Sequence, residues 1–171
     1  MKIGLFYGST TCYTEIAAEK IQTTIGADLI ELHNIKDEPL SHCLAYDFII
    51  FGISTWDYGE LQEDWESCWQ DIANLDLSGK TIALYGMGDQ IGYSEWFQDA
   101  LGMLHEQVIV QGAQLIGYWP NKGYEFSASK ALNENKSNFV GLSLDEDNQY
   151  QLSEQRIEQW CEQILVEYSA L

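Results

Sequence analysis

G-S-T-T-C-Y-T-E at residues 8–15 follows directly on the apolar run I-G-L-F-Y at residues 3–7. The apolar run predicts a short buried strand, and the pattern that begins at Thr14 predicts a helix. In an open α/β sheet, a phosphate binds beyond the carboxyl end of the first strand, at the N-terminus of the next helix. The stretch is therefore a candidate phosphate loop, although a turn rich in Ser and Thr can equally be a plain helix cap.

The candidate loop offers hydroxyl groups but no cation. The hydroxyls belong to Ser9, Thr10, Thr11 and Thr14, and no Lys or Arg lies among residues 8–15. Backbone N–H dipoles and hydrogen bonds would therefore hold an anion by themselves. This chemistry suits a small phosphomonoester better than a triphosphate that arrives with its metal ion.

Length and composition predict a single domain over residues 1–171. The chain has two prolines, which leaves little room for linkers. No window approaches the roughly 18 apolar residues that a membrane span needs, and the first residues lack a signal-peptide pattern, so we expect a cytoplasmic protein. The four cysteines are scattered without a C-x-x-C pair, which predicts free thiols and no metal site.

The charge balance narrows the class of partner. Twenty-seven acidic residues against eight basic ones give a net charge of −19. Nucleic acid and anionic membranes are poor partners for such a chain, because both require clustered Lys and Arg. A protein with a basic face remains, steered to this chain over a long range. A merely solvated acidic surface stays open as the alternative.

Apolar runs that alternate with helical patterns predict an α/β fold. Continuous apolar runs are typical of parallel strands buried on both faces. The expected strands are 3–7, 29–33, 48–53, 81–85 and 115–118, with a short continuation at 139–144. Short connections between strands and helices favour a doubly wound five-stranded parallel sheet of order 2-1-3-4-5.

Four stripes of apolar residues have the period of a helix. The first begins near Thr14 and ends at Gly26, and Ser153 is a candidate N-cap for the last. Residues 35–46 predict one short helix. Residues 119–138 are polar and irregular and interrupt the expected last strand, as a functional loop or an insertion would.

Two further loops are expected at the same edge of the sheet as the candidate phosphate loop. They read S-T-W-D-Y-G-E at residues 54–60 and G-M-G-D-Q-I-G-Y at residues 86–93. Trp56 and Tyr93 would form a slot for a flat ring, with about 1 kcal/mol of stacking energy for each aromatic pair. A single loop Trp is often only an edge-of-core residue, but three such loops at one edge favour a ligand site.

The whole chain resembles the long-chain flavodoxins, which are electron carriers that bind FMN non-covalently. The runs that carry the resemblance are Y-G-S-T-T-C-Y-T-E at 7–15, S-T-W-D-Y-G-E-L-Q-E-D-W at 54–65, G-M-G-D-Q-I-G-Y-S-E-W-F-Q-D-A-L-G at 86–102, G-Y-W-P-N-K-G-Y-E-F at 117–126 and F-V-G-L-S-L-D-E-D-N-Q at 139–149. The resemblance implies a flavodoxin-like sheet whose last strand is interrupted by the loop that defines the long-chain class.

The resemblance also implies how each segment would contact FMN. The residues around the phosphate would be Ser9, Thr10, Thr11, Cys12, Tyr13 and Thr14. Those of the second loop would be Ser54, Thr55, Trp56, Asp57, Tyr58 and Gly59, with Trp56 on the inner face of the ring. The remaining contacts would be Tyr93 on the outer face, Gly88, Asp89 and Gln98 at the pyrimidine edge, and Asp147 near the ribityl chain.

The candidate phosphate loop departs from the family pattern at two positions. Cys12 stands where flavodoxins usually have Gly, and Tyr13 stands where they usually have Lys or Asn. Glycine serves there for a positive φ or a close backbone approach. Cys12 therefore bears on the loop geometry and the FMN affinity, and a second carrier subtype within the family would explain it.

The resemblance implies a low-potential one-electron carrier that alternates between flavin semiquinone and hydroquinone. A flip of the Asp57–Tyr58 peptide would supply an acceptor for flavin N5, and acidic residues such as Asp57 and Asp89 would disfavour the anionic hydroquinone. We expect a monomer that forms transient, salt-sensitive complexes with reductases and acceptors that present a basic face, steered by Glu60, Glu63, Asp64 and Glu66.

Other functions on a similar sheet fit the sequence less well. An FMN-dependent NAD(P)H:quinone reductase is the main alternative, but Tyr93 would block hydride approach and no basic cluster awaits a nucleotide. A phospho-receiver needs acidic residues after the first and third strands, where this chain has Tyr7-Gly8-Ser9 and Gly52-Ile53-Ser54. No histidine lies near the loop hydroxyls in sequence, so we expect no activated nucleophile.

Overall fold

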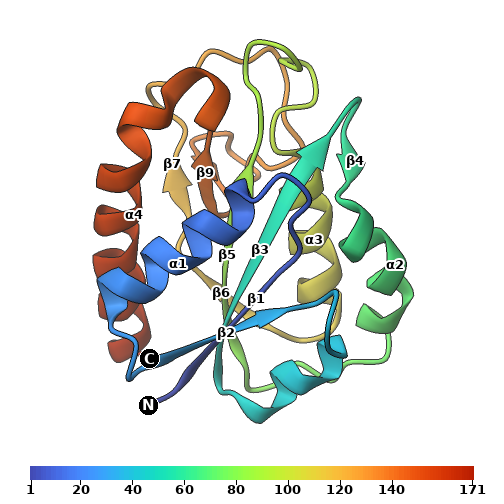
Figure 1. Cartoon of the computed structure of the whole chain (residues 1–171), viewed down its shortest axis with the longest axis vertical. Helices are drawn as coiled ribbons and strands as arrows, with labels where there is room; N and C mark the ends of the chain where they lie inside the picture. Colours follow the sequence, from blue (N-terminus) through green and yellow to red (C-terminus); the bar gives the residue numbers. More distant parts are fainter.

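The computed structural model describes all residues 1–171 as three layers, with helices on both faces of a central sheet (Figure 1). The strands of the sheet are β1 (Ile3–Tyr7), β2 (Ile30–Asn34), β3 (Phe48–Trp56), β4 (Glu60–Leu61), β5 (Thr81–Met87), β6 (Gln114–Ile116) and β9 (Leu142–Leu144). Its main path runs β2-β1-β3-β5-β6, and all neighbours along this path are parallel. The predicted doubly wound order is confirmed.

The last strand is interrupted, as the sequence predicts. β6 pairs with the first half of β5, where Ala83 faces Ile116, and β9 pairs with the second half, where Gly86 faces Ser143. The insertion, residues 119–138, leaves the sheet between these two pieces. It begins and ends in a small antiparallel hairpin of β7 (Trp119–Pro120) and β8 (Asn138–Phe139).

Each face of the sheet carries its own core. The helices are α1 (Tyr13–Ile25), α2 (Glu63–Ile72), α3 (Asp99–Val110), α4 (Glu146–Ser169) and the 3-10 helix η1 (Leu40–Ala45). Side chains of α1 and α4 pack in one core, and those of η1, α2 and α3 pack in the other. Both cores are rich in β-branched and aromatic residues from the strands, whose continuous apolar pattern reflects burial on both sides.

The helix starts show one wrong prediction. Helix α4 begins at Glu146, and its N-cap is Asp145, whose carboxylate accepts a hydrogen bond from the Asn148 backbone N–H at 3.0 Å. Ser153 lies buried inside this helix and caps nothing. The backbone at Gln149 has non-helical angles, so a kink separates the first turn from the amphipathic part that the periodicity detects.

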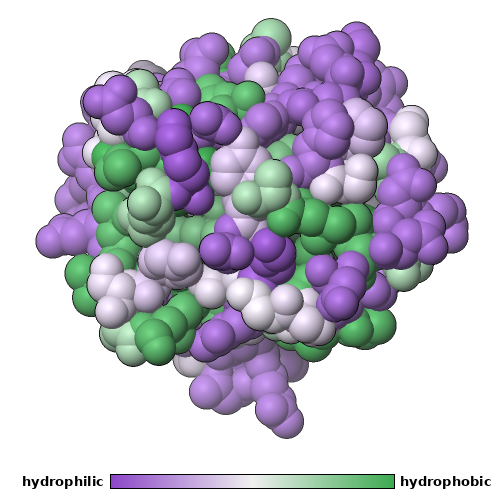
Figure 2. All heavy atoms as spheres, turned by 90° about the horizontal axis from the view of Figure 1, so that it is seen from below, coloured by the Kyte–Doolittle hydropathy of each residue, from purple (hydrophilic) through white to green (hydrophobic).

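The end of the sheet where the strands begin carries both chain termini, and it is the lower end of Figure 1. Figure 2 views this end and shows several small apolar patches separated by hydrophilic side chains. No helix in the structure has the length and apolar character needed to traverse a membrane.

Candidate functional site

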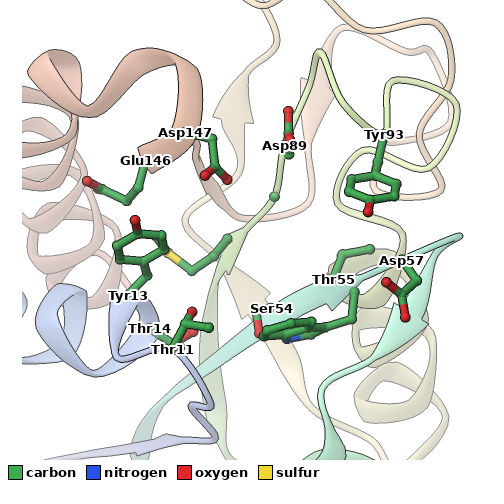
Figure 3. Close-up of a pocket in the computed structure, with 13 residues that line it drawn as sticks. Thr11, Tyr13, Thr14, Ser54, Thr55, Asp57, Asp89, Tyr93, Glu146 and Asp147 are labelled. Atoms are coloured by element: carbon green, nitrogen blue, oxygen red, sulfur yellow. The ribbon is translucent and has the colours of Figure 1, made fainter.

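A cavity of about 470 Å³ opens at the carboxyl edge of the sheet (Figure 3). It lies at the switch point between β1 and β3, where a doubly wound sheet binds its ligand. The loops after β1, β3 and β5 and the first turn of α4 supply its walls. The lining residues are Thr11, Tyr13, Thr14, Ser54, Thr55, Trp56, Asp57, Met87, Gly88, Asp89, Tyr93, Glu146 and Asp147.

The loop between β1 and α1 has the features of an anion site. Cys12 adopts a left-handed conformation with φ +71°, which turns the chain into the helix. Tyr85, a fully buried residue of β5, donates its hydroxyl to the Thr14 carbonyl at 2.8 Å and fixes the first turn. The Ser9 hydroxyl is buried without a hydrogen-bond partner inside the protein. A buried hydroxyl without a partner is costly, which favours a ligand that donates or accepts a hydrogen bond there.

The loop after β3 is a tight hairpin that presents Trp56 to the cavity. β3 continues to Trp56, three residues beyond the predicted end, and β4 pairs back onto it antiparallel. The indole Nε1 donates to Ser54 Oγ at 2.9 Å, which fixes the ring in the wall. Positive φ angles at Asp57 (+44°) and Gly59 (+85°) close the hairpin.

The loop after β5 is shaped by two carboxylates, the partly exposed Asp89 and the buried Asp145. Asp89 accepts hydrogen bonds from the backbone N–H groups of Ile91 and Gly92, at 3.1 and 2.7 Å. Asp145, which is fully buried, accepts two hydrogen bonds from Gln90, one of them at 2.7 Å. The loop and the start of α4 are thereby joined, and together they form one wall of the cavity.

Tyr93 extends from this same loop over the cavity, on the side away from β3 (Figure 3). Its side chain is 38% exposed. The Tyr58 ring contacts it at a centroid distance of 6.3 Å, and Tyr58 also contacts Trp96 at 5.1 Å. The cavity therefore has an indole in one wall and a phenol over its opening, as the slot for a flat ring requires.

The cavity is lined by acidic side chains and by no basic ones. Asp57, Asp89, Glu146 and Asp147 line it, and no Lys, Arg or His does. Partial burial raises the pKa of Asp147, and the neighbouring carboxylates of Asp89, Asp145 and Glu146 raise it further. Any reaction that adds an electron to a ligand here therefore works against a negative field.

The cavity unites most of the predicted contacts. From the three loops and α4, it gathers Thr11, Tyr13, Thr14, Ser54, Thr55, Trp56, Asp57, Gly88, Asp89, Tyr93 and Asp147. The predicted residues outside its lining are Ser9, Thr10, Cys12, Tyr58, Gly59 and Gln98. Five of these belong to the lining loops, and Tyr58 is 69% exposed at the tip of its hairpin.

Gln98 is not among the residues that line the cavity, and it lies next to the lining residue Gly88. Its side chain is fully buried, and its amide Nε2 donates to the carbonyls of Gly86 and Leu144, at 3.1 and 3.2 Å. The residue joins the ends of β5 and β9 and reaches this place through a left-handed backbone (φ +61°). The resemblance alone does not indicate this conformation. The amide Oε1 of Gln98 is buried without a hydrogen-bond partner, so the contact at the pyrimidine edge stays a prediction.

Two lining residues, Met87 and Glu146, are missing from the sequence prediction. Met87 is the last residue of β5 and adjoins the predicted Gly88. Glu146 opens α4 beside Asp147. Met87 could have been predicted from the sequence, because residues at the carboxyl ends of strands face the ligand in such sheets. Glu146 could not be found in this way, because the start of α4 was predicted at Ser153.

The comparisons with known proteins identify the family. The flavodoxin family model matches residues 5–160, which is most of the chain. The chain belongs to the flavodoxin family. Flavodoxin 2 of Escherichia coli K12 is 57% identical over 167 residues, covering 98% of this chain and 96% of that protein. The flavodoxin of Synechococcus elongatus is 46% identical over 168 residues, covering 98% of each.

A solved structure agrees with the fold. The flavodoxin of Fusobacterium nucleatum, solved with bound flavin mononucleotide, superimposes with a TM-score of 0.91 at 26% identity, covering 97% of this chain and 98% of that one. Flavodoxins are electron-transfer proteins and not enzymes, and they work with reductases and acceptor proteins. The family relationship therefore does not favour the quinone reductase alternative.

Proposed function

We propose that this flavodoxin is a low-potential carrier of single electrons that holds FMN non-covalently in the cavity described above. Bound FMN would supply the redox chemistry, because its ring accepts and releases electrons one at a time. The observation that carries the proposal is the combination of the unpartnered Ser9 hydroxyl with Trp56 and Tyr93 at one switch point. A residue set of this kind matches a phosphate at one end and a flat ring at the other.

The loop between β1 and α1 would hold the phosphate. Ser9 offers its free hydroxyl, and Thr11 and Thr14 face the cavity at the N-terminus of α1. Backbone N–H groups of the first helical turn have no intrahelical acceptor and favour an anion. No Lys or Arg lines the cavity, so the phosphate charge stays largely uncompensated by cations.

The ring would lie between Trp56 and Tyr93. Gly88 and Asp89 would approach its pyrimidine edge, and Asp147 the ribityl chain, all of them lining residues. Since the Asp89 carboxylate already accepts backbone hydrogen bonds from its own loop, its contribution is to shape that loop as well as to add charge. Ser54 orients the indole of Trp56.

The acidic lining would set the potential. Reduction adds negative charge to the ring, and Asp57, Asp89, Glu146 and Asp147 stand around the cavity. Like charges a few ångströms apart in a partly desolvated site repel by about 1–4 kcal/mol. This repulsion makes the fully reduced carrier a strong reductant.

The partners would be redox proteins that present a basic face, in transient complexes. The acidic rim, defined as Glu60, Glu63, Asp64 and Glu66, follows the Trp56 hairpin and opens α2. We place the protein in the long-chain class, because the insertion divides the last strand between β6 and β9. We also propose that residues 1–171 act as one FMN-binding domain in the cytoplasm and as a monomer.

The visible spectrum of the purified protein tests the proposal. Oxidised flavin bands, with free FMN released by acid precipitation, are the expected result. Titration of the loaded protein with a one-electron donor should then resolve two separate steps, the second at the lower potential. A colourless protein that takes up no added FMN would refute the site, and steady oxidation of NADPH by the protein alone would refute the carrier function.

A further inference from the structure

Gln62 is a fully buried polar residue that connects two loops of the cavity without lining it. It follows β4 directly and is the N-cap of α2, so it stands where the Trp56 hairpin returns into the fold. Its side chain makes a hydrogen bond to Thr10, which lies 52 positions earlier in the chain, in the loop between β1 and α1. Burial of an amide with no solvent contact requires that its hydrogen-bonding groups find partners inside the protein.

The hydrogen bonds fix the orientation of this amide. Its Oε1 accepts from the Trp65 backbone N–H at 3.3 Å, and its Nε2 donates to Thr10 Oγ1 at 3.0 Å and to Asp64 Oδ2 at 2.8 Å. The reversed amide would set an oxygen against the Asp64 carboxylate and an NH₂ group against the Trp65 N–H. Only one orientation therefore satisfies the three neighbours.

This orientation determines what the Thr10 hydroxyl can do. A hydroxyl has one proton to donate and two lone pairs that accept. Since the Gln62 amide occupies a lone pair, the Thr10 proton is directed away from Gln62 and stays available for an acceptor outside the protein. Thr10 is exposed and adjoins Ser9, whose buried hydroxyl has no partner.

The contact between the two segments leaves no room for adjustment. A Cβ atom at Gly8 would lie 2.3 Å from Gln62 Oε1 and 3.0 Å from Trp65 Cδ1. Trp65 is itself fully buried and donates its indole Nε1 to the Gly52 carbonyl at 2.8 Å. The position of the amide relative to the loop between β1 and α1 is therefore fixed by packing on both sides.

We propose that Gln62 is a positioning residue that orients the Thr10 hydroxyl toward the ligand phosphate and so increases the preference of this flavodoxin for FMN over riboflavin. The inference rests on the proposed FMN function. Because Gln62 also follows the Trp56 hairpin, it mechanically joins the segment at the phosphate to the segment at the ring. A residue that only capped α2 would affect stability, but it would not distinguish two ligands that share a ring and differ in the phosphate.

Titration of the apoprotein with FMN and with riboflavin, followed by quenching of flavin fluorescence, tests this role. Gln62→Met should weaken FMN binding by about five- to tenfold and riboflavin binding by less than about twofold, because the Thr10 hydroxyl loses the donor that directs its proton toward the phosphate. Gln163→Met is the matched control, since that amide also makes two donations, to the Tyr118 carbonyl and to Glu167, but lies far along α4. The control should leave the ratio of the two affinities unchanged.

Substitutions at the exposed Thr10 test the same role if Gln62→Met folds poorly. Thr10→Val should lower the ratio of FMN to riboflavin affinity as Gln62→Met does, whereas Thr10→Ser should retain it. In the double variant the two effects should fall short of their sum, because Gln62 acts only through the Thr10 hydroxyl, which Thr10→Val removes. An unchanged ratio in Gln62→Met, or full additivity with Thr10→Val, overturns the inference. Absence of FMN binding in the unmodified protein would instead refute the proposed function.

Discussion

Cys12 occupies a backbone conformation that usually belongs to glycine. Its φ of +71° lies in the left-handed region, and its side chain is exposed and caps no group of α1. For a residue with a Cβ atom this conformation costs about 1–2 kcal/mol. The usual glycine at this position in flavodoxins therefore has a physical reason, and this chain accepts strain at the candidate phosphate loop.

Replacement of Cys12 by glycine should relieve that strain. We expect Cys12→Gly to raise the free energy of unfolding of the apoprotein by about 0.5–1 kcal/mol, because the relief exceeds the added entropy of the unfolded chain. Urea unfolding measures the change. Cys12→Ala removes the thiol but keeps the Cβ atom, so it should remain close to the unmodified protein, and a destabilised glycine variant would contradict the explanation.

Asp99 carries a buried carboxyl group beneath the Trp56 hairpin. It is 2% exposed, and burial raises its pKa, although the Lys130 backbone N–H donates to it at 2.8 Å. A carboxyl group with a raised pKa contributes stability that is fully present below its pKa in the unfolded chain, near 3.9, and is lost as the pH rises through its pKa in the folded protein.

Asp99→Asn should remove this pH dependence and keep the acceptor for Lys130. Unfolding measured from pH 3.5 to 7 should show the unmodified protein losing stability relative to the variant as the pH rises. The exposed Asp28→Asn controls for the loss of one surface charge. A constant difference between the unmodified protein and Asp99→Asn across this range would contradict the assignment.

At the scale of elements, the insertion is packed against α3 through a glycine. A Cβ atom at Gly102 would lie 2.2 Å from the Lys130 carbonyl oxygen of the insertion. The rings of Tyr124 and Phe126, also from the insertion, pack on Phe97 just before α3 with centroid distances of 5.8 and 5.5 Å. The insertion is therefore part of the packed structure and covers one side of this helix.

Gly102→Ala should be destabilising although it improves helix propensity. The propensity gain is about 1 kcal/mol, while overpacking against backbone atoms costs about 1–3 kcal/mol, so we expect a net loss near 1 kcal/mol. Thermal unfolding of the apoprotein measures it. Gln70→Ala on the exposed face of α2 reports the effect of a better helix former without a packing change. A gain of stability in both variants would show that the insertion yields easily.

The sequence indicated elements better than it indicated their ends. The apolar run at 48–53 marked β3, but the strand continues through polar Ser54 and Thr55 to Trp56, because pairing with β4 extends it. The start of α4 was missed since Asp145 caps a turn that has no apolar stripe. The site was predictable where residues stand at strand ends, as with Trp56 and Asp89, and not where the start of a helix was missed, as with Glu146.

At the scale of the whole molecule, the chain has a net charge of −19, and no Lys, Arg or His lines its cavity. The acidic rim opens α2, on the opposite flank of the molecule from α4 (Figure 1). Long-range attraction acts on the net charge, but orientation of a partner depends on where the charge lies. Two variants with equal net charge can therefore separate these effects.

Glu63→Gln with Glu66→Gln should slow association with a basic reductase by about two- to fivefold at low salt, because the acidic rim directly follows the Trp56 hairpin at the cavity and orients the partner. Glu154→Gln with Glu158→Gln, on α4, removes the same charge and should have a smaller effect. Stopped-flow measurements at several ionic strengths check this. The two pairs should converge in high salt, where surface charges are screened. Equal rates for both pairs at low salt would show that only net charge matters.

The chain starts and finishes at the end of the molecule away from the cavity. A tag, a fused reductase domain or a linker to an electrode joined at either terminus would therefore leave the mouth of the site open. Such a tether would attach the molecule at the end opposite the cavity, so that the support does not cover the site. Carriers built from this protein could be immobilised without engineering a new attachment point.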